Sequence, residues 1–223
     1  MSKVIIVCHG PSMLLEEMGD VIDGHDTVIR LKSCANTLKK PEFYGTKTDI
    51  IGGSLTIAGK LRDLPAEKFW IWTDSRHESW EWNDHINALP HIFRGKNVFI
   101  DRSLCDQWNT TYRNMRKANP TEDWDEQMKA SRYDTGEGEN HMSQGLHALV
   151  YACALLKPEA VHLIGFDNVY TGEFDWSVTR GEDWRAYPRH RWDIENQMVG
   201  LISEHYNVPV GFIMPDPPQE AIG

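Results

Sequence analysis

The chain has 223 residues and carries 23 Lys and Arg against 33 Asp and Glu, so its formal net charge is −10 with neutral histidines. Hydrophobic residues make up 40% of the chain and charged residues 25%, a globular composition that excludes disordered and fibrous proteins. The length fits one domain spanning residues 1–223, and the excess of negative charge opposes a broad attraction to nucleic acid.

Seven short segments rich in Val, Ile, Phe and Trp predict strands, and most are continuously apolar, which is typical of strands covered on both faces. They are residues 4–8, 27–31, 49–51, 69–72, 97–100, 161–164 and 208–213. Helical spacing predicts helices at residues 12–18, 55–64, 78–89, 104–118, 143–156 and 191–206. The alternation predicts an α/β protein with a single doubly wound, mainly parallel sheet of about seven strands, helices on both faces and a Rossmann-type arrangement.

Two long segments break this alternation. Residues 119–142 are polar and acidic, and residues 167–189 are rich in Trp, Tyr, Asp, Gly and Arg. Loops longer than about 12 to 15 residues in a compact domain usually carry function. We therefore expect residues 167–189 to form a flexible lid loop.

The sequence shows no membrane span and no disulfide framework. No apolar run approaches the ~20 residues that a membrane helix needs, and the first ten residues are typical of a buried strand instead of a signal peptide. Cys8, Cys34, Cys105 and Cys153 are widely spaced without a CxxC pair, so a structural zinc site is not indicated either. A cytoplasmic location is expected, and the sequence carries no signal for the oligomeric state.

The turn after the first strand is a candidate binding site. Gly10 allows close approach of the backbone, while Pro11 and Ser12 suit the start of a helix whose free amides would attract a phosphate. A plain connection between strand and helix is the alternative. The GxGxxG and Walker patterns are both absent, which removes the usual signatures of dinucleotide oxidoreductases and phosphate-loop ATPases.

Four motifs in order resemble those of sialyltransferases, both the bacterial lipooligosaccharide enzymes and the animal enzymes. Residues 4–12, Val-Ile-Ile-Val-Cys-His-Gly-Pro-Ser, resemble the opening strand and turn. Residues 22–30 with 44–49 resemble the rest of the long sialyl motif, and residues 141–167 resemble the short one. His190 and Glu195 fit the terminal motif, a histidine followed by a glutamate.

The resemblance implies a variant glycosyltransferase-A-like domain that transfers a sugar from a nucleotide-sugar donor to an acceptor hydroxyl, with inversion and without a metal. No cofactor is implied beyond the nucleotide-sugar co-substrate. His190 would be the general base, because an imidazole with a pKa near 6.5 accepts a proton at neutral pH. A helix-capping role is the alternative for His190. Glu195 would support a helix or the acceptor.

The donor would lie on residues that match the family's motifs. Ser143, Gln144 and Gly145 begin a predicted helix whose amides would stabilise the leaving phosphate, although Ser143 can also be a plain helix cap. Arg30 fits the family's arginine at a strand end, which would bind the donor. A purely structural salt bridge is an equally weighted alternative role for Arg30. Asp167 ends the short motif.

Three departures from the bacterial enzymes concern the donor. Asparagines that touch the donor there are replaced here by His9, Lys32 and, in a less secure alignment, Gly53. His9 and Lys32 add potential positive charge, which suits a donor with more phosphate, such as a nucleoside diphosphate sugar. We therefore hypothesise a donor other than CMP-sialic acid.

Metal binding is not expected. Asp123-Trp124-Asp125 matches the DxD pattern of metal-dependent glycosyltransferases, but no strand precedes it and it lies in a charged stretch. A solvated acidic loop is the stronger interpretation.

The expected lid carries aromatic and basic residues. Tyr170 lies near a position where the family places a tyrosine on the departing phosphate, although the match slips by one residue. Tyr187 and Arg189 are candidates for the acceptor side, and arginines gather around them. The acceptor would be a glycan or a modified base.

Two alternatives to a glycan-directed enzyme remain open. One is a phage-type DNA-modifying glycosyltransferase that moves a sugar, for example a pentose, from a UDP-sugar to a hydroxylated pyrimidine, so that nucleic acid is a partner. The other is a nucleotide-binding module without catalysis, which the lost asparagines favour.

Overall fold

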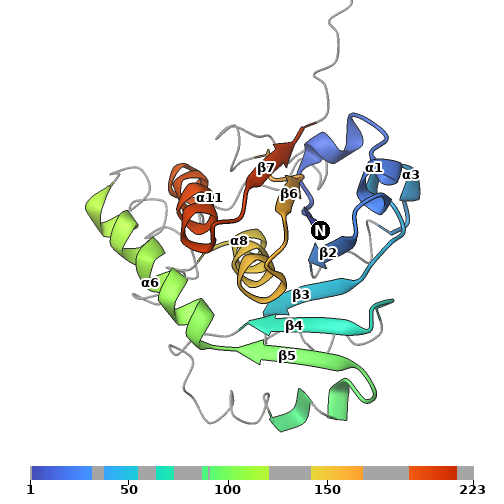
Figure 1. Cartoon of the computed structure of the whole chain (residues 1–223), viewed down its shortest axis with the longest axis horizontal. Helices are drawn as coiled ribbons and strands as arrows, with labels where there is room; N and C mark the ends of the chain where they lie inside the picture. The colour runs from blue at the N-terminus through green and yellow to red at the C-terminus, as the bar shows by residue number, and fades with distance from the viewer. Residues whose placement is uncertain are drawn as a thin grey trace, which may run out of the picture.

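A single parallel sheet organises the chain (Figure 1). The computed structural model describes residues 2–31, 38–54, 64–72, 87–89, 91–120, 142–167 and 191–214. Seven strands lie in the order β5-β4-β3-β2-β1-β6-β7, and every neighbouring pair is parallel. They are β1 (Lys3–Val7), β2 (Thr27–Leu31), β3 (Ile50–Ser54), β4 (Lys68–Trp72), β5 (Asn97–Asp101), β6 (Ala160–Ile164) and β7 (Val210–Ile213). The predicted open α/β sheet of about seven strands is confirmed.

Both faces of the sheet are covered, as the continuously apolar strands predict. In β1, Val4 and Ile6 pack into one buried cluster, while Ile5 and Val7 pack into another on the opposite face. All four side chains are at most 1% exposed. A strand that alternated apolar and polar residues would leave one of these clusters without its central side chains.

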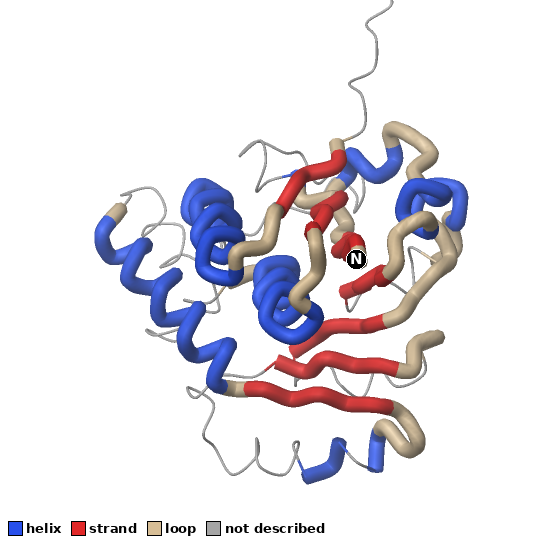
Figure 2. Tube along the Cα trace, in the orientation of Figure 1, coloured by secondary structure: helices blue, strands red, loops and turns tan. Residues whose placement is uncertain are grey.

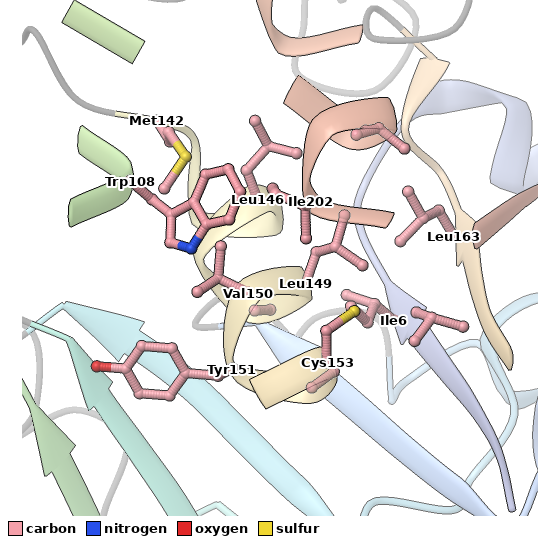
Figure 3. Packing of buried hydrophobic residues seen from close by; sticks show 14 of the residues in the cluster. Ile6, Trp108, Met142, Leu146, Leu149, Val150, Tyr151, Cys153, Leu163 and Ile202 are labelled. Carbon is pink, nitrogen blue, oxygen red and sulfur yellow. The ribbon is translucent and has the colours of Figure 1, made fainter. Parts of the chain in front are cut away.

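Three helices cover one face: α6 (Ser103–Ala118), α8 (Gln144–Tyr151) and α11 (Trp192–Tyr206). Figure 2 shows them together on one side of the strands. Helix α8 lies in the middle, and Leu146, Leu149 and Val150 face the neighbouring elements in Figure 3. A turn of π-helix, η4 (Ala152–Leu156), follows α8 directly. This face holds the largest buried cluster and fixes the start of α8 at the carboxyl edge of the sheet.

Short helices cover part of the other face. They are the 3-10 helix η1 (Pro11–Leu14), α1 (Gly19–Asp23) and α3 (Pro41–Tyr44). The helix expected over residues 12–18 is thus a 3-10 turn that ends at Leu14. Its N-cap residue is Gly10, which has no side chain to cap the turn. The helices expected at 55–64 and 78–89 lie largely outside the described residues, as does the expected lid loop after Asp167.

Candidate functional site

The turns that follow β1 and β6 run side by side at the carboxyl edge of the sheet. The Cys8 amide donates to the Ile164 carbonyl and the Gly10 amide donates to the Gly165 carbonyl, both at 2.9 Å. Gly165 has a φ of +70°, a left-handed conformation that favours glycine. The first turn and the end of the short motif therefore form one continuous surface, at the edge where α/β proteins bind ligands.

Asp167 joins these two turns through Ser12. Its carboxylate accepts a hydrogen bond from the Ser12 amide at 2.7 Å and another from the Ser12 hydroxyl. A Cβ on Gly10 would lie 2.5 Å from the Asp167 carboxyl carbon, so only glycine leaves room for this side chain. Burial raises the pKa of Asp167, opposed by the Ser12 hydrogen bonds. The sequence predicts free amides for a phosphate at this turn, but the Ser12 amide is already bonded to a carboxylate.

The N-terminus of α8 packs on the same two turns. A Cβ on Gly145 would lie 2.6 Å from the Phe166 ring and 3.1 Å from the Cys8 sulfur, so this glycine is needed for the close approach. The Ser143 hydroxyl caps the helix by accepting from the Leu146 amide at 3.4 Å. The structure thus brings the Gly10 turn and the helix start at Ser143 together.

A second buried carboxylate completes this cluster. Glu195 in α11 is 0% exposed, and its Oε1 accepts a hydrogen bond from the Ser143 amide at 2.9 Å. Burial, with the negative charges of Glu195 and Asp167, raises the pKa of the Cys8 thiol well above its ordinary value. The raised pKa favours the protonated thiol over the reactive thiolate at neutral pH. Glu195 makes a helix-supporting contact, and the helix it supports is α8.

Trp72 and His147 belong to the site although the sequence analysis did not single them out. The Trp72 indole N–H donates to Gln144 Oε1 at 3.0 Å, and the Trp72 ring stacks on His147 with centroids 5.7 Å apart. His147 Nδ1 lies 3.0 Å from the Ser143 carbonyl oxygen. A signal existed, because Trp72 ends a predicted strand and therefore lies at the carboxyl edge. Gly53 lies in β3, two strands from β1, and pairs with Ile71.

Arg30 is bonded within its own motif. It is 0% exposed, and its guanidinium donates to the carbonyls of Tyr44 at 2.7 Å and Lys47 at 3.0 Å. Asp23 accepts from the amides of Thr46 and Lys47, and these bonds lower its pKa although burial opposes them. The residues of the second motif thus hold β2 and the approach to β3 together. A donor contact by Arg30 stays a prediction.

Helix α6 holds the start of α11, next to the predicted base. The Tyr112 hydroxyl accepts from the Arg191 amide at 3.1 Å. The Arg191 guanidinium donates to the Asn119 carbonyl and to the Asp193 carboxylate. Arg191 is one of the arginines that gather around Tyr187 in the sequence, and its guanidinium is therefore bonded within the protein.

The same face of α6 also holds the approach to α8, since Asn109 Oδ1 accepts from the Met142 amide at 3.1 Å. Sequence reasoning missed Asn109 and Tyr112, because their partners lie 33 and 79 positions further along the chain.

Several predicted site residues fall outside the described part of the chain: Lys32, Tyr170, Tyr187, Arg189 and His190. His9 follows β1 and is half-buried, and Pro11 begins η1. No group of three or more His, Cys, Asp or Glu within the described ranges is placed to hold a metal ion, and Asp123 and Asp125 lie outside them. Among the described helices, none has both the length and the apolar composition of a membrane span.

Comparison with known proteins identifies the class of fold. Neither a protein-family model nor a curated protein matches the sequence. Two crystal structures of a mammalian sialyltransferase superpose on the chain. One is a complex with Gal-beta-1-3GalNAc-ortho-nitrophenol, with a TM-score of 0.51 and 14% identity. The other has a TM-score of 0.52 and 13% identity.

Each superposition covers 94% of this chain and 68% of the sialyltransferase. The chain therefore has a sialyltransferase-like fold. The resemblance to the bacterial lipooligosaccharide enzymes stays a prediction.

Proposed function

We propose that the chain is a glycosyltransferase that moves a sugar from a nucleotide-sugar donor to an acceptor hydroxyl, with inversion and without a metal. The observation that carries this proposal is the meeting of the Gly10 turn, Asp167 and the start of α8 at one edge of a sialyltransferase-like sheet. Three segments far apart in the sequence lie together there, as a nucleotide-binding edge requires.

The charges of this edge suggest how the donor lies. Glu195 places a buried carboxylate on the start of α8, and Asp167 places one on Ser12 in the turn after β1. His9 follows β1, and Lys32 follows the last residue of β2. Phosphates are repelled by carboxylates and attracted by cations, so they would lie toward the end of β2, away from Glu195, and the nucleoside toward α8. A histidine and a lysine at these two positions, which can both carry positive charge, support a nucleoside diphosphate sugar in preference to CMP-sialic acid.

His190 would act as the general base. The acceptor oxygen attacks the anomeric carbon and passes its proton to the imidazole, while the bond between that carbon and the phosphate oxygen breaks. The position next to His190 in the sequence is anchored, because the Arg191 amide and guanidinium are both hydrogen-bonded. A fixed start of α11 would favour catalysis by positioning, which the proposed role of His190 requires.

A thermal-shift screen tests the proposed donor. CMP, UDP, GDP and their sugars are added separately, and a ligand at a hundred times its Kd is expected to stabilise the fold by about 2.7 kcal/mol. We expect a UDP- or GDP-sugar to give a larger shift and faster hydrolysis than CMP-sialic acid. Faster hydrolysis of CMP-sialic acid would refute the donor assignment.

The variant His190→Ala separates an enzyme from a binding module. It is expected to lose sugar transfer while its Kd for the nucleotide changes little, because the imidazole is assigned to the acceptor side. Full transfer activity in this variant would refute the role of His190. Binding without transfer in the wild-type protein, with every donor and acceptor supplied, would favour the non-catalytic alternative.

A further inference from the structure

Trp72 is held so firmly that its N–H has one direction. The residue is 3% exposed, and its ring covers Gly52, where any Cβ would run into it. The ring lies nearly parallel to His147, at an interplanar angle of 13°, and meets Tyr151 edge to face with centroids 5.8 Å apart. Close packing on these sides leaves the indole no room to turn.

This fixed N–H orients the side chain of Gln144. An indole N–H only donates, so the atom that it meets at 3.0 Å must be the carboxamide oxygen of Gln144. The NH2 group of Gln144 then lies on the other side of the carboxamide. Gln144 as a whole is half-buried, so part of the residue is accessible at the start of α8.

The helix start around Gln144 is equally fixed. The first amides of a helix have no partner within it. At this helix the Ser143 amide is bonded to Glu195 and the Leu146 amide to the Ser143 hydroxyl. These two hydrogen bonds fix the backbone on either side of Gln144, so its side chain starts from a fixed position.

We propose that Trp72 is a positioning residue that presents the Gln144 NH2 group to an acceptor atom on the nucleoside of the donor. The proposal rests on the proposed function and deepens it. A nucleoside fits better than a phosphate here, because the Glu195 carboxylate lies on the Ser143 amide and repels anions. A base carbonyl or ring nitrogen is a neutral acceptor that suits an NH2 donor.

The variant Gln144→Glu tests the contact. It keeps an oxygen for the Trp72 N–H and replaces the NH2 group by a second oxygen. The probes are the pairs UMP and UDP, CMP and CDP, and GMP and GDP, measured by calorimetry. For the pair that binds best, we expect the Kd to rise at least about tenfold. Because the new carboxylate also repels phosphates, the neutral variant Gln144→Met supplies the comparison of monophosphate with diphosphate, and its Kd is expected to rise by the same factor for both.

A double-mutant cycle tests the positioning role. Trp72→Phe is expected to raise the Kd several-fold in the wild-type background and to leave it unchanged in Gln144→Ala. Trp108→Phe is the matched control, because the Trp108 N–H is also partly buried and donates to the Tyr206 hydroxyl at 3.2 Å, away from Gln144. This control is expected to leave the Kd unchanged in both backgrounds.

Each outcome is decisive. An unchanged Kd in Gln144→Met overturns the contact, and a factor that grows from monophosphate to diphosphate in Gln144→Met overturns its assignment to the nucleoside. Equal effects of Trp72→Phe in both backgrounds overturn the positioning role. If Trp72→Phe does not fold, Gln144→Glu and Gln144→Met still test the contact. If no nucleotide binds the wild-type protein, the proposed function fails instead.

Discussion

Glu195 places a carboxylate at the start of a helix that belongs to a different segment. Its Oε1 accepts a hydrogen bond from the Ser143 amide. Glu195 is 0% exposed, and so is Met142, the residue before Ser143. A buried amide that loses its acceptor costs about 1 to 3 kcal/mol. The identity of this residue therefore matters for stability as well as for the site.

Glu195→Ala is expected to lower the free energy of unfolding by about 2 kcal/mol, whereas Glu195→Gln loses less because it keeps an oxygen acceptor. Urea unfolding followed by circular dichroism measures both. Equal losses in the two variants would show that the charge of Glu195, and not its hydrogen bond, stabilises the start of α8.

His162 makes the stability depend on pH. His25 Nδ1 faces the Val21 carbonyl at 2.8 Å and must carry a proton there, so in neutral His25 the Nε2 atom accepts from His162 Nδ1 at 2.6 Å. Burial, and then the charges of His25 and Lys3, lower the pKa of His162. Below the unfolded value of about 6.5 the unfolded chain binds more protons than the folded one, so stability falls as the pH falls.

The stability of the wild-type protein relative to His162→Gln is therefore expected to drop between pH 7 and pH 5. Urea unfolding at several pH values measures the difference. A relative stability that rises toward pH 5 would contradict the direction of the pKa shift.

At the scale of elements, helix α6 connects the two approaches to the site. Asn109 and Tyr112 lie three positions apart on one face of α6 and bond the amides of Met142 and Arg191. Met142 precedes α8, and Arg191 precedes α11. One helix thus fixes the starts of the two helices that carry the candidate site.

Tyr112→Phe is expected to lower the rate of sugar transfer about tenfold, because the Arg191 amide next to the predicted base loses its partner. Tyr206→Phe is the matched control, since its hydroxyl joins α6 to the opposite end of α11 through Trp108. We expect it to leave transfer unchanged. Equal transfer rates in both variants would contradict a role for Tyr112 in placing the base.

The strands and the longer helices could be predicted from the sequence, and the short helices could not. Strand β2 has the predicted bounds, and α6 and α11 begin within one residue of theirs. Helices α1 and α3 have five and four residues, too few for a helical period to appear. The sequence motifs pointed to the parts of the candidate site around Gly10 and Gly145. Trp72 was marked only as the end of a predicted strand, and Tyr112 carried no local signal, because tertiary packing brings in their partners.

At the scale of the molecule, the sheet is covered unevenly. Ile5 and Ile6 in β1 are 0% exposed and lie between β2 and β6, whereas Phe99 and Ile100 in the edge strand β5 are 38% and 36% exposed. Backbone amides with more burial around them open less often. The middle of the sheet should therefore be its most stable part.

Hydrogen exchange is expected to be slowest at the amides of β1 and β6 and faster at those of β5. Mass spectrometry of exchanged peptides, or NMR of individual amides, measures the order. Slower exchange in β5 than in β1 would indicate that the edge strand is protected by contacts beyond those described.

The hydrogen bonds around Arg30 bear on which residues can be substituted without loss of the architecture. Arg30, Asp23 and Lys47 bind main-chain atoms of their own region. They keep the strands in place whatever molecule is bound. Side chains such as His9, outside these bonds, can then change without loosening β2 or β3, so the architecture and the choice of bound molecule can vary independently.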